Sequence, residues 1–170
     1  MNSNQVNRTS AAEPKPGEWI APGEFAEVIR LTPLVAIDLV VRSAEGRVLV
    51  GRRVNEPAKG LLFVPGSRIS KNETRAAAFK RITREELGVE LEIERSRFLG
   101  VYEHLYPTNR FERAGFGTHY IVLAHELRHA LDHSKLPKDQ HGEYLWLTPE
   151  ELLASPEVHA NTKAYFGAAV

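Results

Sequence analysis

The chain has 170 residues, of which 42% are hydrophobic, and its 22 basic and 22 acidic residues give a formal net charge of zero. This length supports one hydrophobic core rather than two, and the zero net charge provides no general attraction to nucleic acid or to an anionic membrane. The chain has no cysteine, which excludes disulfides and thiolate metal sites and leaves oxygen and imidazole groups as candidate ligands.

The N-terminal segment, MNSNQVNRTSAAEPKPGEW, lacks the apolar core of a secretory signal. No apolar run in the chain approaches the roughly 20 residues that a membrane-spanning helix requires. We therefore expect a cytoplasmic protein with neither a membrane nor a nucleic-acid partner. Residues 1–17 are polar and contain two prolines, which is typical of a disordered arm, and we predict a single domain over residues 18–170.

The domain is predicted to begin with a short amphipathic helix in the segment PGEFAEVIRLTP. Pro22 precedes the helical pattern, and Pro33 ends it because proline cannot continue a helix. Phe25, Val28 and Ile29 fall on one side, where they can pack against the rest of the fold.

The next segments read as strands. Leu34–Val41 is rich in branched apolar residues and indicates a buried strand, and the turn SAEG leads to a second strand, RVLVG, so that the two form a β-hairpin. The loop RRVNEPAKG then leads to a short strand, LLFV, which ends at the turn formed by Pro65 and Gly66.

A helix is predicted from about Asn72, as its N-cap, to Leu87, with Gly88 directly after its end. Three further strands follow in RFLGVYEHLY, FGTHYIVLAHEL and EYLWL, and two closing helices in TPEELLAS and PEVHANTKAYFGAA. This order of elements predicts a mixed sheet wrapped by helices, an α/β sandwich.

The helix ending at Leu87 carries the most informative pattern. Ile82, Glu85 and Glu86 project toward one side because they are three and four residues apart. Crowded carboxylates repel one another, and a divalent cation can relieve that repulsion. A solvated acidic helix end is the alternative, and composition alone favours it. Glu73 lies eight residues before Arg81, so a salt bridge between them is expected.

The order of residues changes this balance, because the segment resembles the Nudix box of nucleoside diphosphate hydrolases. The residues that carry the resemblance are Gly66, Glu73, Arg81, Glu85, Glu86 and Gly88. Two positions depart from the box: Ser67 replaces its first glycine, and Ile82 replaces the glutamate after the arginine. The missing glutamate argues against an arrangement of several metal ions around a diphosphate.

One branch of the Nudix family, GDP-mannose mannosyl hydrolase, tolerates an apolar residue at that position. This chain is similar to that branch from about Phe25 to Phe166, in segments such as GRRVNEPAKG, FVPGSR, GVYEHLY, THYIVL, DQHGEYLWLT and VHANTKAYF. The resemblance implies a Nudix-type α/β/α sandwich with a mixed sheet. It also implies Mg²⁺-dependent hydrolysis of GDP-mannose, or GDP-glucose, to GDP and free sugar by water attack at the anomeric carbon with inversion.

The resemblance further implies a metal site and a base. Glu86 and Gln140 are the implied side-chain ligands of one Mg²⁺, with Mn²⁺ as an alternative, and the Gly66 carbonyl supplies a third oxygen. Glu85 is a spare acid that leaves a second metal conceivable. His141 matches the base that activates water, although a histidine before a glycine, taken alone, is more often a surface turn residue.

The remaining implied site residues contact substrate. Arg53 and Arg68 match arginines that hold the diphosphate, with surface salt bridges as their alternative, whereas Arg81 is expected to fasten the helix to neighbouring acids. Asp38 interrupts an apolar strand and needs hydrogen-bond donors, either in the active site or as the structural partner of an arginine. His104 and Tyr120 match active-site positions and could equally be wall residues.

Phe25 is a candidate for stacking on the guanine base near a subunit contact, since members of the branch are homodimers, but a short amphipathic helix would bury it anyway. His125, His129, His133 and His159 are read as solvated or packing residues. Two rival functions remain: a conventional Nudix pyrophosphatase that cleaves a nucleotide sugar at phosphorus, and a silent nucleotide-sugar-binding domain. Retention of the ligands and the base argues against the silent domain, and Ile82 indicates a change of reaction.

Overall fold

The computed structural model describes residues 20–129, 131, 136–138 and 141–167, so the predicted arm over residues 1–17 lies outside the described residues. The elements are, in chain order, α1 (Pro22–Leu31), β1 (Leu34–Arg42), β2 (Val48–Arg53), β3 (Leu62–Phe63), β4 (Gly66–Arg68), α2 (Arg75–Leu87), a 3-10 turn (Ile93–Arg95), β5 (Arg97–Tyr106), β6 (Thr118–Arg128), β7 (His141–Leu147), α3 (Pro149–Ala154) and α4 (Ala160–Ala164). Each helix in these ranges is too short or too polar to cross a bilayer.

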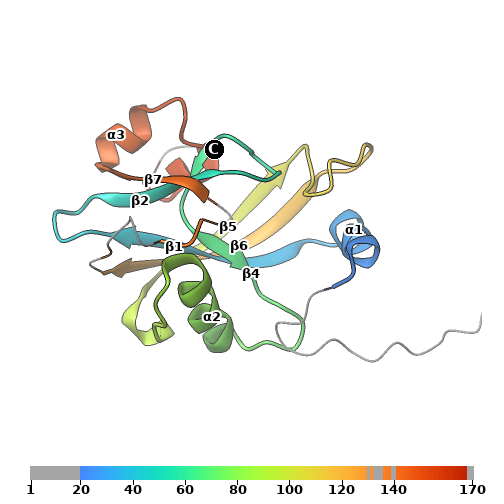
Figure 1. Cartoon of the computed structure of the whole chain (residues 1–170), viewed down its shortest axis with the longest axis horizontal. Coiled ribbons are helices and arrows are strands. Elements are labelled where there is room, and N and C mark those ends of the chain that lie inside the picture. The colour runs from blue at the N-terminus through green and yellow to red at the C-terminus, as the bar shows by residue number, and fades with distance from the viewer. Residues whose placement is uncertain (1–19, 130, 132–135, 139–140, 168–170) are drawn as a thin grey trace, which may run out of the picture.

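One seven-stranded mixed sheet organises the fold, with the order β3-β2-β1-β6-β5, and with β4 added to β1 and β7 added to β2. Strands β1 and β6 run parallel along their length, while the other pairs are antiparallel. Helix α2 lies against one face of the sheet and α3 lies on the other side (Figure 1). The predicted α/β/α sandwich with a mixed sheet is confirmed.

The strand β1 separates two cores because its side chains alternate between the faces of the sheet. Ile37, Leu39 and Val41 pack with Phe79 and Ile82 of α2. On the other face Val40 packs with residues of β2 and β3 and with Leu152 of α3. Asp38 lies on this second face, and it is the one charged residue inside β1 before Arg42. The sheet therefore positions a carboxylate inside an apolar layer.

Two local predictions are refined by the structure. The predicted hairpin of β1 and β2 is present, but the two strands are joined at the single pair Arg42↔Val48, because beyond this pair β4 adds to β1 and β3 adds to β2. The turn at Pro65 and Gly66 leads directly into a short strand, β4, which was not predicted. This strand exists through its pairing with β1, which is distant in the sequence, so a local pattern does not predict it.

Helix α2 begins at a different cap from the predicted one. Thr74, not Asn72, is the N-cap, and its hydroxyl accepts a hydrogen bond from the Ala77 N–H. Asn72 has a positive φ of 62° and lies in the preceding turn. The helix ends as predicted at Gly88, which adopts the left-handed conformation and donates to the Arg84 carbonyl. These ends determine which face of α2 meets the sheet, and they bury Ile82 and Glu86.

Arg81 joins α2 to the segment that precedes it. Its Nε and Nη2 donate to the two oxygens of Glu73 at 2.7 and 2.8 Å, and Nη2 also donates to the Arg68 carbonyl of β4 at 2.9 Å. Its Nη1 donates to Glu85 at 2.8 Å. Glu73 also closes the turn before α2, because its Oε2 accepts a hydrogen bond from the Ser70 N–H. The expected Arg81–Glu73 salt bridge is confirmed.

We predict unequal costs for removing the two acidic partners of Arg81. Glu73 has a side chain only 5% exposed, whereas that of Glu85 is 45% exposed. Glu73→Gln should lower the free energy of unfolding by roughly 3 kcal/mol, because it removes the buried carboxylate that pairs with two nitrogens of Arg81 and leaves only the exposed Glu85 as a countercharge. Glu85→Gln should cost less than about 1 kcal/mol, since an exposed pair is screened by water. Urea unfolding of both variants measures this, and equal costs would contradict the assignment.

Candidate active site

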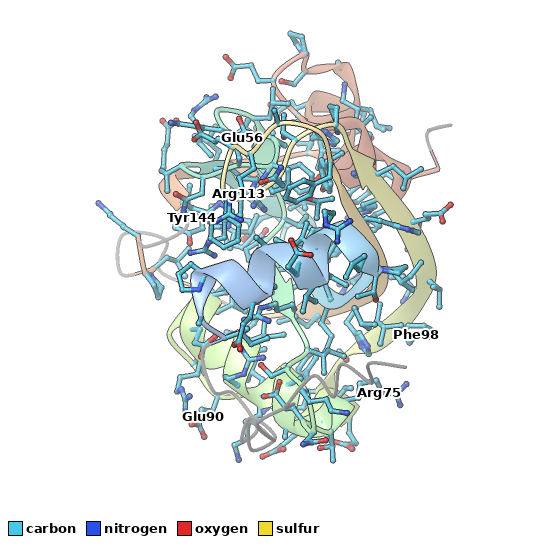
Figure 2. The ribbon with its side chains drawn as sticks, turned by 90° about the vertical axis from the view of Figure 1, so that its right-hand side faces the viewer. Glu56, Arg75, Glu90, Phe98, Arg113 and Tyr144 are labelled. Carbon is cyan, nitrogen blue, oxygen red and sulfur yellow. The ribbon has the colours of Figure 1, made fainter. Side chains whose placement is uncertain are left out.

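A cavity of about 340 Å³ opens beside α1, between the loop after β2 and the loop between β5 and β6. In Figure 2, α1 crosses the middle of the view, with Glu56, which lines the cavity, above it and Arg75 of α2 below it. The structure brings seven predicted site residues together in its wall: Phe25, Asp38, Arg53, Gly66, Arg68, His104 and Tyr120.

One part of the wall combines aromatic rings with guanidinium groups. The Arg68 guanidinium lies 4.1 Å from the centre of the Phe25 ring, and the Arg53 guanidinium lies 5.5 Å from the centre of the Phe63 ring. Phe25 of α1 is buried, and its ring packs edge-to-face with that of Phe111. Such contacts hold each guanidinium in place, and the buried Nε of Arg53 has no hydrogen-bond partner among the described residues. This wall can therefore bind an anion.

Asp38 forms the acidic centre of the cavity. It is 8% exposed, and burial raises the pKa of its carboxyl group to about 6, although a hydrogen bond from Tyr165 and the positive charge of Arg53 act in the opposite direction. The Tyr165 hydroxyl donates to Oδ2 at 2.6 Å. Oδ1 faces Gly66, since a Cβ on that glycine would collide with it. The carboxylate is therefore held between a tyrosine and a backbone that only glycine permits.

His104 stands next to this carboxylate. It is 3% exposed, its Nε2 lies 3.3 Å from the Tyr165 hydroxyl, and its ring meets Phe63 and Tyr106. Burial lowers the pKa of its imidazole to about 4, with a smaller contribution from His159. The imidazole is therefore neutral at pH 7 and available for hydrogen bonding rather than for charge pairing.

A second buried pair lies behind Arg53. The His141 Nε2 is 3.7 Å from Oε2 of Glu86, and the two side chains are 3% and 2% exposed. Burial, and next the positive charge of Arg53, lower the pKa of His141 to about 4. The ring rests directly on Gly51, where an added Cβ would lie 2.5 Å from Cγ and from Nδ1. Glycine in β2 thus makes the space that the imidazole occupies.

The Gly66 carbonyl points away from β1 because of the register of β4. Leu39 N–H donates to the Pro65 carbonyl and Ile69 N–H donates to the Val35 carbonyl. Hydrogen-bonded and non-hydrogen-bonded pairs alternate along an antiparallel ladder, so Gly66, opposite Asp38, turns its carbonyl away from β1. The Arg68 carbonyl, two residues later, points the same way and accepts from Arg81 of α2.

Two of the implied oxygen ligands of one hard cation lie in the described part of the chain. Gly66 lines the cavity, whereas Glu86 is a buried carboxylate on α2 outside the lining, and the His141 ring beside it lies outside the lining as well. Gln140, the third implied ligand, lies outside the described residues. Within the described part of the chain, no three side chains of His, Cys, Asp or Glu form a group that could hold a metal ion. The implied set differs from such a group because a carbonyl and an amide provide two of its oxygens.

Several residues in or next to the cavity were missed by the sequence analysis. Tyr106, the last residue of β5, and Arg110 in the loop after it line the cavity, and Tyr165, which follows α4, contacts the lining residue Asp38. Glu56 also lines the cavity and accepts a hydrogen bond from Thr108 at 2.8 Å, which joins the two loops. Glu56, Tyr106 and Tyr165 lie within the segments GRRVNEPAKG, GVYEHLY and VHANTKAYF, which carried the family resemblance. Their place in these segments is the signal that could have suggested them.

The other histidines fit the packing role where the structure describes them. His125 packs between Phe79 and Phe98 and contacts Ser96. His159 caps α4 by accepting from the Asn161 N–H, and its ring packs on Phe63. His129 is half-buried after β6, while His133 lies outside the described residues.

Comparisons with known proteins place the chain in one family. The NUDIX domain model matches residues 32–168. The chain is 45% identical over 130 residues to the low-salt glycan biosynthesis protein Agl8 of Haloferax volcanii, covering 76% of this chain and 80% of that protein.

Solved structures show the same fold. The MutT protein of Methanosarcina mazei Go1 superimposes with a TM-score of 0.64 at 20% identity, covering 81% of this chain and 93% of that one. The NUDIX domain of NrtR from Shewanella oneidensis, in complex with ADP ribose, has a TM-score of 0.60 at 15% identity, covering 86% and 96%.

We predict that His104 contributes to the loss of stability in acid. Its pKa is about 4 in the folded chain and 6.5 in the unfolded chain, so the unfolded state takes up the proton first as the pH falls from 6.5 to 4. Stability is therefore present above pH 6.5 and is lost across this window, by roughly 3 kcal/mol. The unfolding free energy of His104→Gln, measured in urea at pH 7 and pH 4.5, should fall less than that of the wild type. Equal decreases would contradict the assigned burial of a neutral imidazole.

Proposed function

The chain belongs to the Nudix domain family, and we propose that it hydrolyses GDP-mannose or GDP-glucose to GDP and the free sugar. In this reaction water attacks the anomeric carbon with inversion, and the carbon–oxygen bond to the diphosphate breaks. The leaving group is a stable anion, so it needs neutralisation of charge more than it needs a proton. The site then has to supply a base for water and cations for the diphosphate.

The observation that carries this proposal is the buried pair of Glu86 and His141 beside Ile82. Ile82 is fully buried in the apolar core with Phe79, so the position where the family pattern has a glutamate carries an apolar side chain that cannot bind a metal ion. In place of a third acid, an imidazole lies 3.7 Å from Glu86. A carboxylate with an imidazole supports one metal ligand next to one base better than it supports a cluster of metal ions.

The relatives support a sugar-nucleotide substrate. The name of the Haloferax volcanii relative assigns that protein to glycan biosynthesis, a process that consumes activated sugars. The Nudix domain of the Shewanella oneidensis protein was crystallised with ADP ribose, which has a diphosphate between a nucleoside and a sugar. The cavity of this chain provides the groups that such a ligand needs, which are a cationic wall for phosphates and polar groups for a sugar.

One Mg²⁺, or alternatively Mn²⁺, would be held by Glu86, Gln140 and the Gly66 carbonyl, and when bound it would neutralise charge on the departing diphosphate. Arg53 and Arg68 bind the diphosphate oxygens, since their planar groups donate paired hydrogen bonds. His141, neutral at pH 7, accepts the proton of the attacking water. Asp38, His104 and Tyr120 bind and orient the sugar, and Phe25 stacks on the base.

The remaining parts of the proposal concern assembly and location. We propose a cytoplasmic homodimer in which Phe25 lies near the subunit contact, acting on a small-molecule nucleotide sugar without nucleic acid or membrane. Glu85 is engaged by Arg81 at 2.8 Å, so it serves the ion-pair network in this conformation. This contact favours one metal ion over two.

The position of ¹⁸O in the products tests the proposed bond cleavage. The enzyme is incubated with GDP-mannose and Mg²⁺ in ¹⁸O-labelled water, and every product is analysed by mass. We expect the label in free mannose and none in GDP. Label in GMP or in mannose 1-phosphate would instead establish attack at phosphorus, as in a conventional pyrophosphatase. Absence of turnover with GDP-mannose, GDP-glucose and other nucleotide sugars would favour the silent binding domain.

His141→Gln tests the base. Gln retains a polar group of similar reach but cannot take up a proton at neutral pH, so kcat should fall by about 10²- to 10⁴-fold. The affinity for Mg²⁺ should change by less than about threefold, because Gln leaves Glu86 and the Gly66 carbonyl in place. Steady-state kinetics and a Mg²⁺ titration measure the two quantities.

His119→Gln is the matched control. His119 lies on β6 and pairs with Glu103 at 3.0 Å on the surface, outside the cavity wall, so kcat should remain within about twofold of wild type. An unchanged kcat in His141→Gln would remove His141 as the base.

A further inference from the structure

The segment around α4 is docked onto the short strand β3. Leu62 N–H donates to the Glu157 carbonyl at 2.8 Å, and His159 N–H donates to the Leu62 carbonyl at 3.1 Å. Val64 N–H donates to the Thr162 hydroxyl at 3.4 Å. Val158 is buried in the core beneath this contact, where Tyr165 packs as well. The C-terminal end of the described chain is therefore held in register with the cavity wall.

This docking delivers the hydroxyl of Tyr165 to two residues of the cavity. It donates to Asp38 Oδ2 at 2.6 Å and lies 3.3 Å from His104 Nε2. The phenol ring is held edge-on by Tyr102, with 4.7 Å between ring centres. A phenol has a single proton. Because that proton goes to the carboxylate, the phenol oxygen can only accept from His104, which must then carry its proton on Nε2.

The direction of these hydrogen bonds determines how both partners face the substrate. Asp38 uses Oδ2 for Tyr165, and its Oδ1 lies against Gly66 in the cavity wall, so the hydrogen bond from Tyr165 holds the rotation of a carboxylate that lines the cavity. His104 with its proton on Nε2 has a bare Nδ1 that can only accept a hydrogen bond. Without the phenol hydroxyl, neither the rotation of the carboxylate nor the tautomer of the imidazole is specified by the contacts described here.

We propose that Tyr165 is a positioning residue of the active site, which orients the Asp38 carboxylate and sets the Nε2–H tautomer of His104 through its hydroxyl. This proposal rests on the proposed function for its kinetic consequence, but its structural content is independent of which substrate is cleaved. Tyr165 acts through Asp38 and His104, so its removal should impair the orientation of the sugar in the transition state more than it impairs the binding of the nucleotide.

The tautomer is tested first, in the full chain without substrate. Two-bond ¹H–¹⁵N correlation spectra of ¹⁵N-histidine-labelled protein at pH 8 distinguish the two neutral tautomers, and His104→Gln assigns the signals. We expect the Nε2–H form of His104 in the wild type and a measurable shift toward the other form in Tyr165→Phe. A wild-type His104 in the Nδ1–H form, or a tautomer unaffected by Tyr165→Phe, would overturn the proposal.

A double-mutant cycle then tests whether Tyr165 acts through Asp38. Tyr165→Phe alone should lower kcat by about 10- to 100-fold, the order of effect expected for a misplaced site group, with KM changed by less than about threefold. In the Asp38→Asn background the same change should lower kcat by less than about threefold, because the residue it positions has already been altered. An equal decrease in both backgrounds would mean that Tyr165 acts independently of Asp38 and would overturn the proposal.

Tyr102→Phe is the matched control. It also removes one phenol hydroxyl, but from the neighbouring ring that packs against Tyr165, and it leaves the cavity wall intact. It should keep kcat within about twofold and the His104 tautomer unchanged. Thermal unfolding of each variant verifies that it is folded. If the wild type cleaves no nucleotide sugar, the proposed function fails, while the spectra still decide the role of Tyr165.

Discussion

The paired hydrogen bonds from Arg81 to Glu73 are the interaction on which the site depends. They connect α2 to the turn before it, and the same guanidinium reaches the Arg68 carbonyl of β4. This contact fixes the position of α2 relative to β4, which carries Gly66 and Arg68. Because Glu73 is almost fully buried, this ion pair specifies a geometry that a solvated pair could not.

Close contact between a glycine backbone and a titratable side chain is the second feature that shapes the site. At Gly51 the His141 ring occupies the volume of a Cβ, and at Gly66 the Asp38 carboxylate does the same. Both contacts bury a titratable group against a strand, and burial then shifts the pKa of His141 downward and that of Asp38 upward. The two glycines thereby make room for two buried titratable groups, an imidazole that is neutral at neutral pH and a carboxyl group whose pKa is about 6.

Much of the fold could be predicted because its signals are local. The branched apolar run from Leu34, the helix ending at Gly88 and the strand of residues 97–106 all follow from patterns within a few residues. The errors arose where two local signals compete or where pairing is not local. Asn72 and Thr74 are both good cap residues, and the turn geometry at Asn72, with its positive φ, selects Thr74. The predicted hairpin is limited to one pair because β4 adds to β1 and β3 adds to β2 beyond it, and the short strands β3 and β4 are not marked by a local pattern of their own.

The sequence by itself indicated the family through its resemblance to the Nudix box, the sandwich through the order of its elements, and the helix that carries Ile82, Glu85 and Glu86 through the spacing of residues along one segment. It also indicated seven residues that line one cavity, through their order along the chain. What each of these side chains does was decided by the tertiary structure. Glu85 turns to Arg81 while Glu86 is buried beside His141, although the two are adjacent in sequence. Tyr165 reaches Asp38 across 127 residues, because the docking of α4 on β3 depends on contacts that no local pattern encodes.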